Sequence, residues 1–256
     1  MKVTLITGAS GGIGESFARA LAKRRQNLVL VARSEDKLHQ LCDELMLQYG
    51  ITAHYVAVDL NDFEADQRLF NETNKHGMEV DWLVNNAGFG SMGDFSELEL
   101  ERELEMIGLN VMVLVALTHR YLQGMRERKS GTIINVSSAA SFQPIPYMAT
   151  YAATKAFVTS FSEAVAEENR EFGIKVLACC PGATATSFFD NAGMKEPFAV
   201  KGVQTPEEVV EETLRAVDKG KTRVITGWVN WFSAYVATFA PNKLVTKTIA
   251  SQLRPR

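Results

Sequence analysis

Short apolar runs alternate with amphipathic stretches along most of the chain. The apolar run at residues 3–6 leads into a glycine-rich loop, after which Phe17 and Leu21 recur at helical spacing. Later runs typical of buried strands lie at residues 28–32, 55–60, 81–84, 131–138, 175–180 and 223–226. Helix-like segments separate them without a break in composition, and this order favours a parallel sheet covered on both faces. The pattern predicts one doubly wound α/β domain over residues 1–256, with a seven-stranded, mainly parallel sheet.

Three segments depart from this alternation. Residues 97–129 form one long helical pattern that is apolar on nearly every side over residues 109–117, so we expect core packing together with a subunit interface there. Residues 183–204 are too long for an ordinary connection, and we interpret them as a substrate lid. Residues 228–256 follow the last strand as a C-terminal aromatic helical extension.

The C-terminal extension carries large side chains at helical spacing on one stripe, and three interpretations compete for it. The stripe consists of Trp228, Trp231, Phe232, Tyr235, Val236 and Phe239. We favour packing against the domain or against a second subunit. Closure of an apolar substrate pocket is the second interpretation. Binding to a membrane surface is the third, which the nearby basic residues Lys243, Lys247, Arg254 and Arg256 keep open.

Composition narrows the partners and the compartment. A net charge of -3 and a pI near 5.9 show no basic excess, so nucleic acid is not an expected partner. The 3 cysteines give no disulfide framework and the 4 histidines show no ligand-like spacing, so we expect a cytoplasmic protein without a metal site. No signal peptide is visible, and no apolar stretch approaches the ~20 residues of a transmembrane helix.

The candidate chemistry centres on Tyr151 and Lys155, which share a face if their segment is helical. An ammonium that close to a phenol favours the phenolate and lowers the phenol pKa from ~10 towards neutrality, as acid/base chemistry on an alcohol or carbonyl requires. Alone, the pair could equally be solvated or packed. Ser138 makes a catalytic role for the pair more convincing. It lies at the carboxyl end of an expected strand, which is where ligands bind in this architecture. The adjacent Ser137 leaves open which hydroxyl points inward.

A glycine-rich loop between the first strand and the first helix indicates a phosphate site. In residues 7–14 glycines let the backbone turn tightly and approach a phosphate, and the helix N-terminus offers its amides to the anion. Arg33 follows the second strand, where an acidic residue would bind the adenosine ribose of NAD. An arginine there can pair with a 2′-phosphate, which favours NADP(H) and leaves NAD(H) as the alternative.

Taken together, the motifs resemble those of the short-chain dehydrogenase/reductase family over residues 1–227. They are Thr7-Gly8-x-x-x-Gly12-Ile13-Gly14, Asn85-Asn86-Ala87-Gly88, Asn110, Ser138, Tyr151-x-x-x-Lys155 and Pro181-Gly182-x-x-x-Thr186. The resemblance is strongest to bacterial oxidoreductases allied to ketoacyl reductases and 17β-hydroxysteroid dehydrogenases. It implies a single Rossmann-type domain, NAD(P)-dependent enzyme activity, and a homodimer or homotetramer.

The resemblance also implies individual roles. Tyr151 would be the acid/base, Lys155 would lower its pKa and bind the nicotinamide ribose, Ser138 would polarise the substrate carbonyl, and Asn110 would hold a water in a proton relay. The implied cofactor contacts, besides Arg33, are Gly8, Ser10, Gly12, Ile13, Gly14, Asp59, Leu60, Asn86, Ala87, Gly88, Tyr151, Lys155, Pro181, Gly182 and Thr186.

Apolar residues near these motifs suggest the substrate. Phe142 and Tyr147 lie between Ser138 and Tyr151, and Phe188 and Phe189 lie in the expected lid. Such a lining suits an apolar ketone or aldehyde and its alcohol, although the same residues could simply pack the lid onto the core. An NAD-linked alcohol dehydrogenase of the same family is the alternative activity. A catalytically idle dinucleotide-binding regulatory protein is the alternative from another class.

Overall fold

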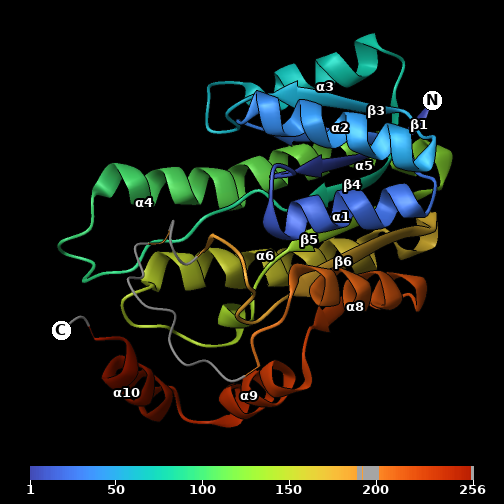
Figure 1. Ribbon diagram of the computed structural model, residues 1–256. Helices are drawn as coiled ribbons and strands as arrows, with labels where there is room; N and C mark the ends of the chain where they lie inside the picture. Colours follow the sequence, from blue (N-terminus) through green and yellow to red (C-terminus); the bar gives the residue numbers. More distant parts are fainter. Residues whose placement is uncertain (189–191, 193–201, 255–256) are drawn as a thin grey trace.

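A parallel sheet of seven strands forms the centre of the computed structural model, which describes residues 1–188, 192 and 202–254 (Figure 1). The strands are β1 (Lys2–Thr7), β2 (Leu28–Ala32), β3 (Ala53–Ala57), β4 (Glu79–Asn85), β5 (Gly131–Val136), β6 (Ile174–Cys180) and β7 (Arg223–Ile225). They lie in the order β3-β2-β1-β4-β5-β6-β7, and every neighbouring pair is parallel. The order switches direction between β1 and β4, which places a ligand-binding crevice at their carboxyl ends. The predicted doubly wound α/β fold is thus confirmed.

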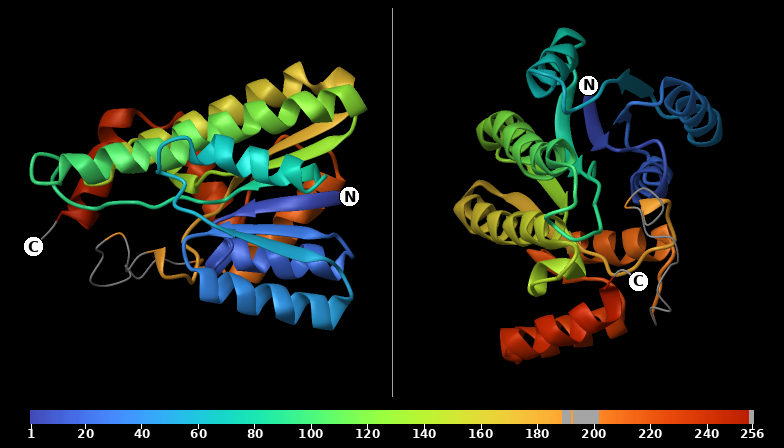
Figure 2. Two further views of the ribbon diagram at one scale, coloured as in Figure 1. Left: turned by 90° about the horizontal axis from the view of Figure 1, so that it is seen from above. Right: turned by 90° about the vertical axis from the view of Figure 1, so that its left-hand side faces the viewer.

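Helices cover both faces of the sheet (Figure 2). They are α1 (Gly12–Lys23), α2 (Glu35–Tyr49), α3 (Ala65–Lys75), α4 (Leu100–Ile107), α5 (Leu114–Arg128), α6 (Ala149–Glu168), α8 (Pro206–Asp218), α9 (Trp228–Phe239) and α10 (Asn242–Leu253), with the shorter η1 (Gly108–Val113), η2 (Ala139–Phe142) and η3 (Arg170–Phe172). Helices α1, α2 and α8 pack on one face, and α3, α5 and α6 pack on the other. Each face of the sheet has its own hydrophobic core. Successive residues of a strand point into these two cores alternately, as Leu5 and Ile6 do in β1.

The long helical pattern at residues 97–129 is three elements instead of one helix. Helix α4 runs into the π-helical turn η1, which contains Asn110, and α5 continues from it. Over residues 109–117 the single chain leaves Met112 67% exposed, so its own core does not cover every side of this stretch. A subunit interface, the other part of the expectation, stays a prediction.

The third strand ends earlier than its apolar pattern predicts. β3 stops at Ala57, whose register partner is Ala32 at the end of β2. Asp59 and Leu60 therefore follow the strand. Leu60 is buried in the core beside Ala65 and the sheet, because the chain turns inward there before α3 begins.

Helices α9 and α10 extend the fold beyond β7. Helix α9 buries Asn230, Ala234 and Ala237, and its large aromatic side chains are exposed. The aromatic stripe therefore does not pack against the domain, and packing against a second subunit, the other part of the favoured interpretation, stays a prediction. No helix in the described part of the chain is both long and apolar enough to cross a membrane.

Most of the expected lid at residues 183–204 lies outside the described residues, but Thr184 and Gln204 near its ends form a parallel bridge.

Candidate active site

Helix α6 carries Tyr151 and Lys155 to the carboxyl end of the sheet. The two residues lie one turn apart, and both are buried. The Lys155 ammonium donates a hydrogen bond to the Val136 carbonyl at the end of β5 (2.9 Å), and its nitrogen lies 5.7 Å from the centre of the Tyr151 ring. The two side chains therefore form an internal pair instead of a solvated one.

The structure separates the roles of the two adjacent serines that follow β5. The Ser137 hydroxyl is buried, donates to the Lys155 backbone carbonyl (2.7 Å) and lies 2.7 Å from the Thr159 hydroxyl. The Ser138 side chain accepts a hydrogen bond from the Ala140 amide (3.1 Å), lines the same pocket as Tyr151, and acts to lower the pKa of the Tyr151 hydroxyl. Ser137 thus fastens β5 to α6, and Ser138 is the serine that faces the tyrosine.

Burial is the largest influence that the protein has on the pKa values of Tyr151 and Lys155. It raises the pKa of Tyr151 to about 12, with the Ser138 hydrogen bond acting in the opposite direction. Burial also lowers the pKa of Lys155 to about 8. The predicted lowering of the phenol pKa by the ammonium is therefore wrong for the chain alone, because loss of hydration penalises both charged forms. At neutral pH the Tyr151 phenol is protonated, which is the form that can donate a proton to a carbonyl oxygen.

Asn110 ties three segments together from inside the π-helical turn. Its amide nitrogen donates to the Phe89 carbonyl (3.0 Å) and to the Thr154 hydroxyl (3.2 Å), and its side-chain oxygen accepts from the Phe89 amide (3.1 Å). A Cβ at Gly88 would lie 2.7 Å from that oxygen and 3.4 Å from the Lys155 nitrogen. The side chain therefore fixes the loop after β4 against α6, directly beside Lys155.

The glycine loop after β1 has the geometry that a dinucleotide phosphate requires. Gly8 and Gly12 have positive φ angles of 66° and 56°, and a Cβ at Gly14 would lie 2.2 Å from the Gly8 carbonyl oxygen. No side chain caps the N-terminus of α1, and a Cβ at Gly11 would meet nothing within 4 Å. The amides of the first turn thus face open space, and the residues present fit a bound nicotinamide dinucleotide.

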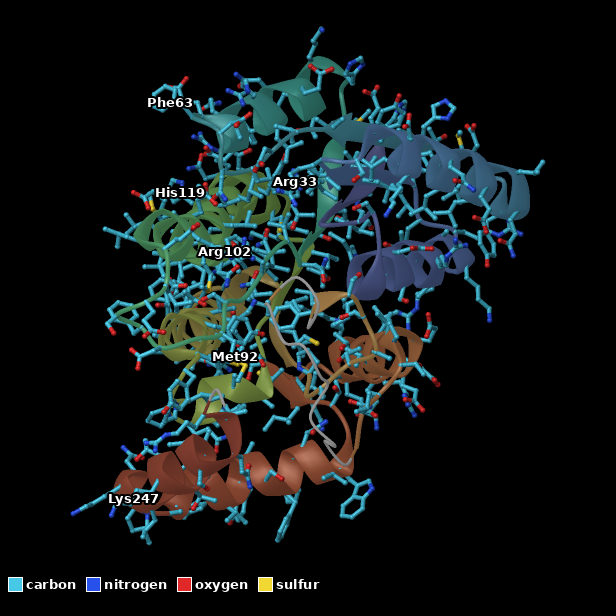
Figure 3. The ribbon with its side chains drawn as sticks, turned by 60° about the vertical axis from the view of Figure 1, so that its left-hand side comes forward. Arg33, Phe63, Met92, Arg102, His119 and Lys247 are labelled. Atoms are coloured by element: carbon cyan, nitrogen blue, oxygen red, sulfur yellow. The ribbon has the colours of Figure 1, made fainter. Side chains whose placement is uncertain are left out.

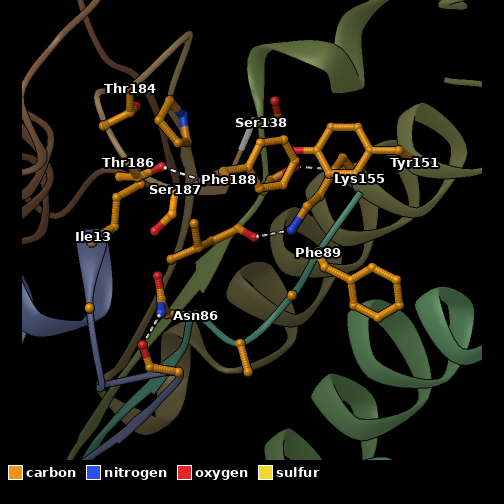
Figure 4. Close-up of a pocket in the computed structure, with 18 of the residues that line it drawn as sticks. Ile13, Asn86, Phe89, Ser138, Tyr151, Lys155, Thr184, Thr186, Ser187 and Phe188 are labelled. Atoms are coloured by element: carbon orange, nitrogen blue, oxygen red, sulfur yellow. Dashed lines mark hydrogen bonds between the residues drawn. The ribbon is translucent and has the colours of Figure 1, made fainter. Parts of the chain in front are cut away.

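One pocket of about 520 Å³ brings the loop and the α6 pair together (Figure 4). Among the residues predicted from the sequence, its lining includes Gly8, Ser10, Gly12, Ile13, Asn86, Ala87, Gly88, Ser138, Tyr151, Lys155, Pro181, Gly182, Thr186 and Phe188. Asn86 holds the loop by donating to the carbonyls of Thr7 (2.9 Å) and Gly8 (3.2 Å). Segments from β1, β4, β5 and β6 therefore converge at one edge of the sheet.

Several other predicted residues lie outside the described lining of this pocket. They are Asn110, Gly14, Arg33, Asp59, Leu60, Phe142 and Tyr147. Asn110 and Gly14 support the lining from behind, as described above, and Leu60 belongs to the core. The Phe142 ring lies under the Arg223 guanidinium, 5.3 Å from its centre, and the Tyr147 hydroxyl accepts from the Arg254 side chain (3.1 Å). Phe189 falls outside the described residues.

The charged groups near the adenosine end differ partly from expectation. The Arg33 side chain is 79% exposed and forms an ion pair of 3.6 Å with Asp59. Lys37, in the first turn of α2, lines the pocket. Lys37 was not among the predicted site residues, although its place four residues after Arg33 in a predicted amphipathic helix was the available signal.

Apolar side chains form the other wall of the pocket. The Phe188 ring centre lies 5.3 Å from that of Tyr151, and a Cβ at Gly90 would lie 2.8 Å from Phe188. Phe89 and Met148 also line the pocket, and Phe89 was not among the residues predicted to do so. Figure 4 shows the Phe188 ring beside Tyr151 and Ser138.

The pocket places a glycine loop, at the point where the strand order reverses, opposite a serine, a tyrosine and a lysine. This fold and this pocket define a nicotinamide dinucleotide-dependent oxidoreductase. A family model described as short chain dehydrogenase matches residues 2–197. The chain belongs to this family of NAD(P)-binding oxidoreductases, as its motifs predicted.

Known proteins of the family resemble the chain over most of its length. A very-long-chain 3-oxoacyl-CoA reductase of Macaca fascicularis is 33% identical, over 88% of this chain and 73% of the relative. A 7beta-hydroxysteroid dehydrogenase of Mediterraneibacter gnavus is 32% identical, over 90% of this chain and 88% of the relative. The structure of a short-chain dehydrogenase from Sphingobium yanoikuyae in complex with NADPH is 31% identical with a TM-score of 0.83, and the match covers 88% of this chain and 87% of that one.

Proposed function

We propose that this protein interconverts an apolar ketone or aldehyde and its alcohol with NADP(H), using Tyr151 as the acid/base. The observation that carries the proposal is the convergence of the Ser138 and Tyr151 hydroxyls, with Lys155 beside them, on the same pocket as the glycine loop. Two hydroxyls that converge in this way can both reach one substrate oxygen. A pure dinucleotide sensor has no need for such a pair.

NADPH supplies a hydride to the carbonyl carbon when it is bound. The Ser138 hydroxyl hydrogen-bonds the carbonyl oxygen and orients it, and Tyr151 gives its proton to that oxygen as negative charge develops. The resulting phenolate is stabilised by the Lys155 ammonium, which Val136 holds beside it. In the oxidising direction the phenolate takes the proton from the alcohol. Asn110 acts as a positioning residue, because it holds Phe89 and Thr154 around this set.

The apolar wall supports a lipophilic substrate. Phe89, Met148 and Phe188 offer apolar surface close to Tyr151, which suits a hydrocarbon skeleton around the reacting group. The names of two relatives point the same way, since one refers to an oxo group on a very long acyl chain and the other to a hydroxyl group on a steroid.

The preference for NADP(H) is supported by two cations at the end of β2 and the start of α2. Arg33 is exposed, and Lys37 lines the pocket. We expect Arg33→Asp and Lys37→Asp each to weaken NADPH binding about tenfold to 100-fold, because a charged hydrogen bond is lost and a repulsion is added. NADH binding should not weaken. Lys75→Asp, an exposed lysine at the end of α3, is the matched control. Unchanged NADPH affinity in both test variants would contradict this preference.

The decisive assay follows nicotinamide absorbance with NADPH and then NADH against aliphatic, aromatic and steroidal carbonyls. We expect turnover of apolar ketones with NADPH and weaker turnover with NADH. Faster alcohol oxidation with NAD would favour the NAD-linked alternative. Cofactor binding without turnover of any compound would favour the regulatory protein. The cytoplasmic location and the oligomeric state stay predictions.

A further inference from the structure

Helix α9 distributes its side chains in the opposite way from an ordinary surface helix. The residues that it buries are small or polar: Asn230, Ala234 and Ala237. Its large residues, which form the aromatic stripe, are all exposed: Trp228, Trp231, Phe232, Tyr235, Val236 and Phe239. The exposure reaches 81% for Trp228 and 72% for Phe239. A contiguous apolar surface of this kind marks a binding site, because a monomer in water gains nothing from exposing it.

Three rings of the aromatic stripe contact one another along the helix. The ring centres of Trp231 and Tyr235 lie 5.5 Å apart and nearly parallel, and those of Tyr235 and Phe239 lie 5.0 Å apart. Mutual contact holds the rings together as one raised surface on α9. Tryptophan and tyrosine combine an apolar ring with a polar tip, and they are enriched where hydrocarbon meets water.

The charge of the chain changes sign at this end of the molecule. All 30 acidic residues and 20 of the 27 basic residues precede Lys219, which gives residues 1–218 a net charge of -10. Residues 219–256 contain the remaining 7 basic residues and no acidic residue. Helix α9 itself carries no charge. An uncharged aromatic surface thus lies within the one strongly positive segment of an otherwise negative protein.

Basic side chains lie on α10, the helix that follows α9 directly. Lys243 and Lys247 lie one turn apart, and both are exposed. Neither forms an ion pair within the described ranges of the chain. Figure 3 shows Lys247 pointing away from the body of the molecule, and Figure 1 shows α9 and α10 together at the edge opposite α3. The two helices therefore offer an apolar surface on α9 and uncompensated positive charge on the helix that follows it.

A second copy of the chain is a poor match for this surface. A two-fold contact would bring the same segment of each copy together. With no acidic residue after Asp218, the lysines of one α10 would find no opposite charge in the facing segment of the other copy. The complementary partner is one that is negatively charged at its surface and apolar just beneath it.

We propose that α9 and α10 bind the surface of an anionic membrane. The aromatic stripe enters the boundary between headgroups and acyl chains, and Lys243 and Lys247 pair with lipid phosphates. The net charge of -10 on the rest of the chain is repelled by the same surface and sets the orientation.

The proposed membrane-binding surface adjoins the substrate side of the pocket. Helix α9 packs on η2, which begins directly after Ser138. The Arg254 side chain at the end of α10 donates to the Tyr147 hydroxyl (3.1 Å). If the proposed function holds, a lipophilic carbonyl compound dissolved in the bilayer reaches the pocket from this side. The membrane-binding proposal does not depend on that step.

The test is sedimentation of the full chain with vesicles of phosphatidylcholine alone and of phosphatidylcholine mixed with phosphatidylglycerol. We expect binding to the mixed vesicles that weakens as salt is added, and little binding to the neutral ones. A triple variant of the aromatic stripe, Trp231→Ser with Tyr235→Ser and Phe239→Ser, should lose binding. Lys243→Ala with Lys247→Ala should weaken it about 25-fold, at about fivefold for each lysine.

Matched controls separate this proposal from the proposed function and from misfolding. Lys219→Ala with Lys221→Ala removes two basic residues outside α9 and α10 and should leave vesicle binding unchanged. The triple variant should keep its circular dichroism and its turnover of a water-soluble ketone, because its substitutions lie on an exposed surface. Three results would overturn the proposal: no binding to mixed vesicles, equal binding to neutral ones, or a triple variant that turns an oligomer into a monomer without losing vesicle binding.

Discussion

Surface helices usually bury apolar side chains and expose polar ones. Helices α6 and α9 both depart from this arrangement, in opposite ways. Helix α6 buries an ionisable phenol and an amine, Tyr151 and Lys155, in a position that most helices fill with leucine or valine. Helix α9 buries alanine and exposes tryptophan and phenylalanine. The first arrangement costs folding free energy, which the Lys155 hydrogen bond to Val136 partly offsets. The second leaves free energy to be gained only when a partner covers the surface.

The difference suggests how each helix should respond to substitution. Changes on the buried side of α6 should alter chemistry or stability, and changes on the exposed side of α9 should alter neither. Substitutions in the two helices can therefore test whether buried polarity and exposed aromaticity serve separate tasks.

The largest expected effect is at Tyr151. Tyr151→Phe removes the proton donor and should lower kcat about 1000-fold with NADPH affinity nearly unchanged. Tyr121→Phe in α5 is the matched control, because the Tyr121 hydroxyl is also buried, has a pKa raised by burial to about 12, and contacts Thr73 (3.2 Å) away from the pocket. Turnover in Tyr151→Phe equal to that of the control would exclude the acid/base role.

A smaller effect should distinguish the two serines. Ser138→Ala removes a donor to the substrate oxygen and should lower kcat about 100-fold. Ser137→Ala removes a hydrogen-bond partner from the Lys155 carbonyl and from the Thr159 hydroxyl and should cost about 1–2 kcal/mol of unfolding free energy with most turnover kept. Steady-state kinetics and urea unfolding of both variants check this. The opposite assignment of the two losses would show that Ser137 contacts the substrate.

The pH dependence should reveal the buried phenol. Alcohol oxidation needs the Tyr151 phenolate, and because burial raises the pKa of the phenol to about 12, the phenolate fraction should grow about tenfold per pH unit above neutrality. Above the Lys155 pKa of about 8 the ammonium is lost, and the rise should become shallower. Carbonyl reduction needs the neutral phenol and should not rise. Measuring kcat/KM in both directions tests this, and an oxidation rate that stays flat above neutral pH counts against a buried, proton-bearing tyrosine.

The smallest effect is expected on stability. Val158→Ala on the buried side of α6 should cost about 2 kcal/mol, since it removes two methyl groups and leaves a cavity. Trp231→Ser on α9 should change the unfolding free energy by less than about 0.5 kcal/mol. Denaturant titration without lipid makes the comparison. A loss for Trp231→Ser as large as that for Val158→Ala would mean that the aromatic stripe already packs against the protein.

Local pattern was sufficient to predict the sheet, the glycine loop and the pairing of Tyr151 with Lys155, because each depends on spacing within one short segment. Tertiary contacts decided what the pattern could not. The choice between Ser137 and Ser138 depends on which hydroxyl meets α6, and the direction of the Tyr151 pKa shift depends on burial by segments far away in sequence. Lys37 enters the pocket because α2 begins close to the glycine loop.

The same limit explains the error at α9. Helical periodicity places the aromatic residues on one side but does not state which side faces the domain. The buried side is decided by close contacts such as the one at Gly182, where a Cβ would lie 2.2 Å from the Asn230 side chain. Only a small or polar residue that fits against this backbone can occupy that side, and the aromatic residues are turned outward.

Asn110 has a consequence for how activity and folding are lost. Its one amide group joins the loop at Phe89, the π-helical turn and Thr154 of α6, across separations of 21 and 44 residues. Release of any one of these segments frees the other two, so the site should be lost in one cooperative step. On heating, turnover should then decline together with the whole fold, and an enzyme assay doubles as a measure of how much of a sample is native.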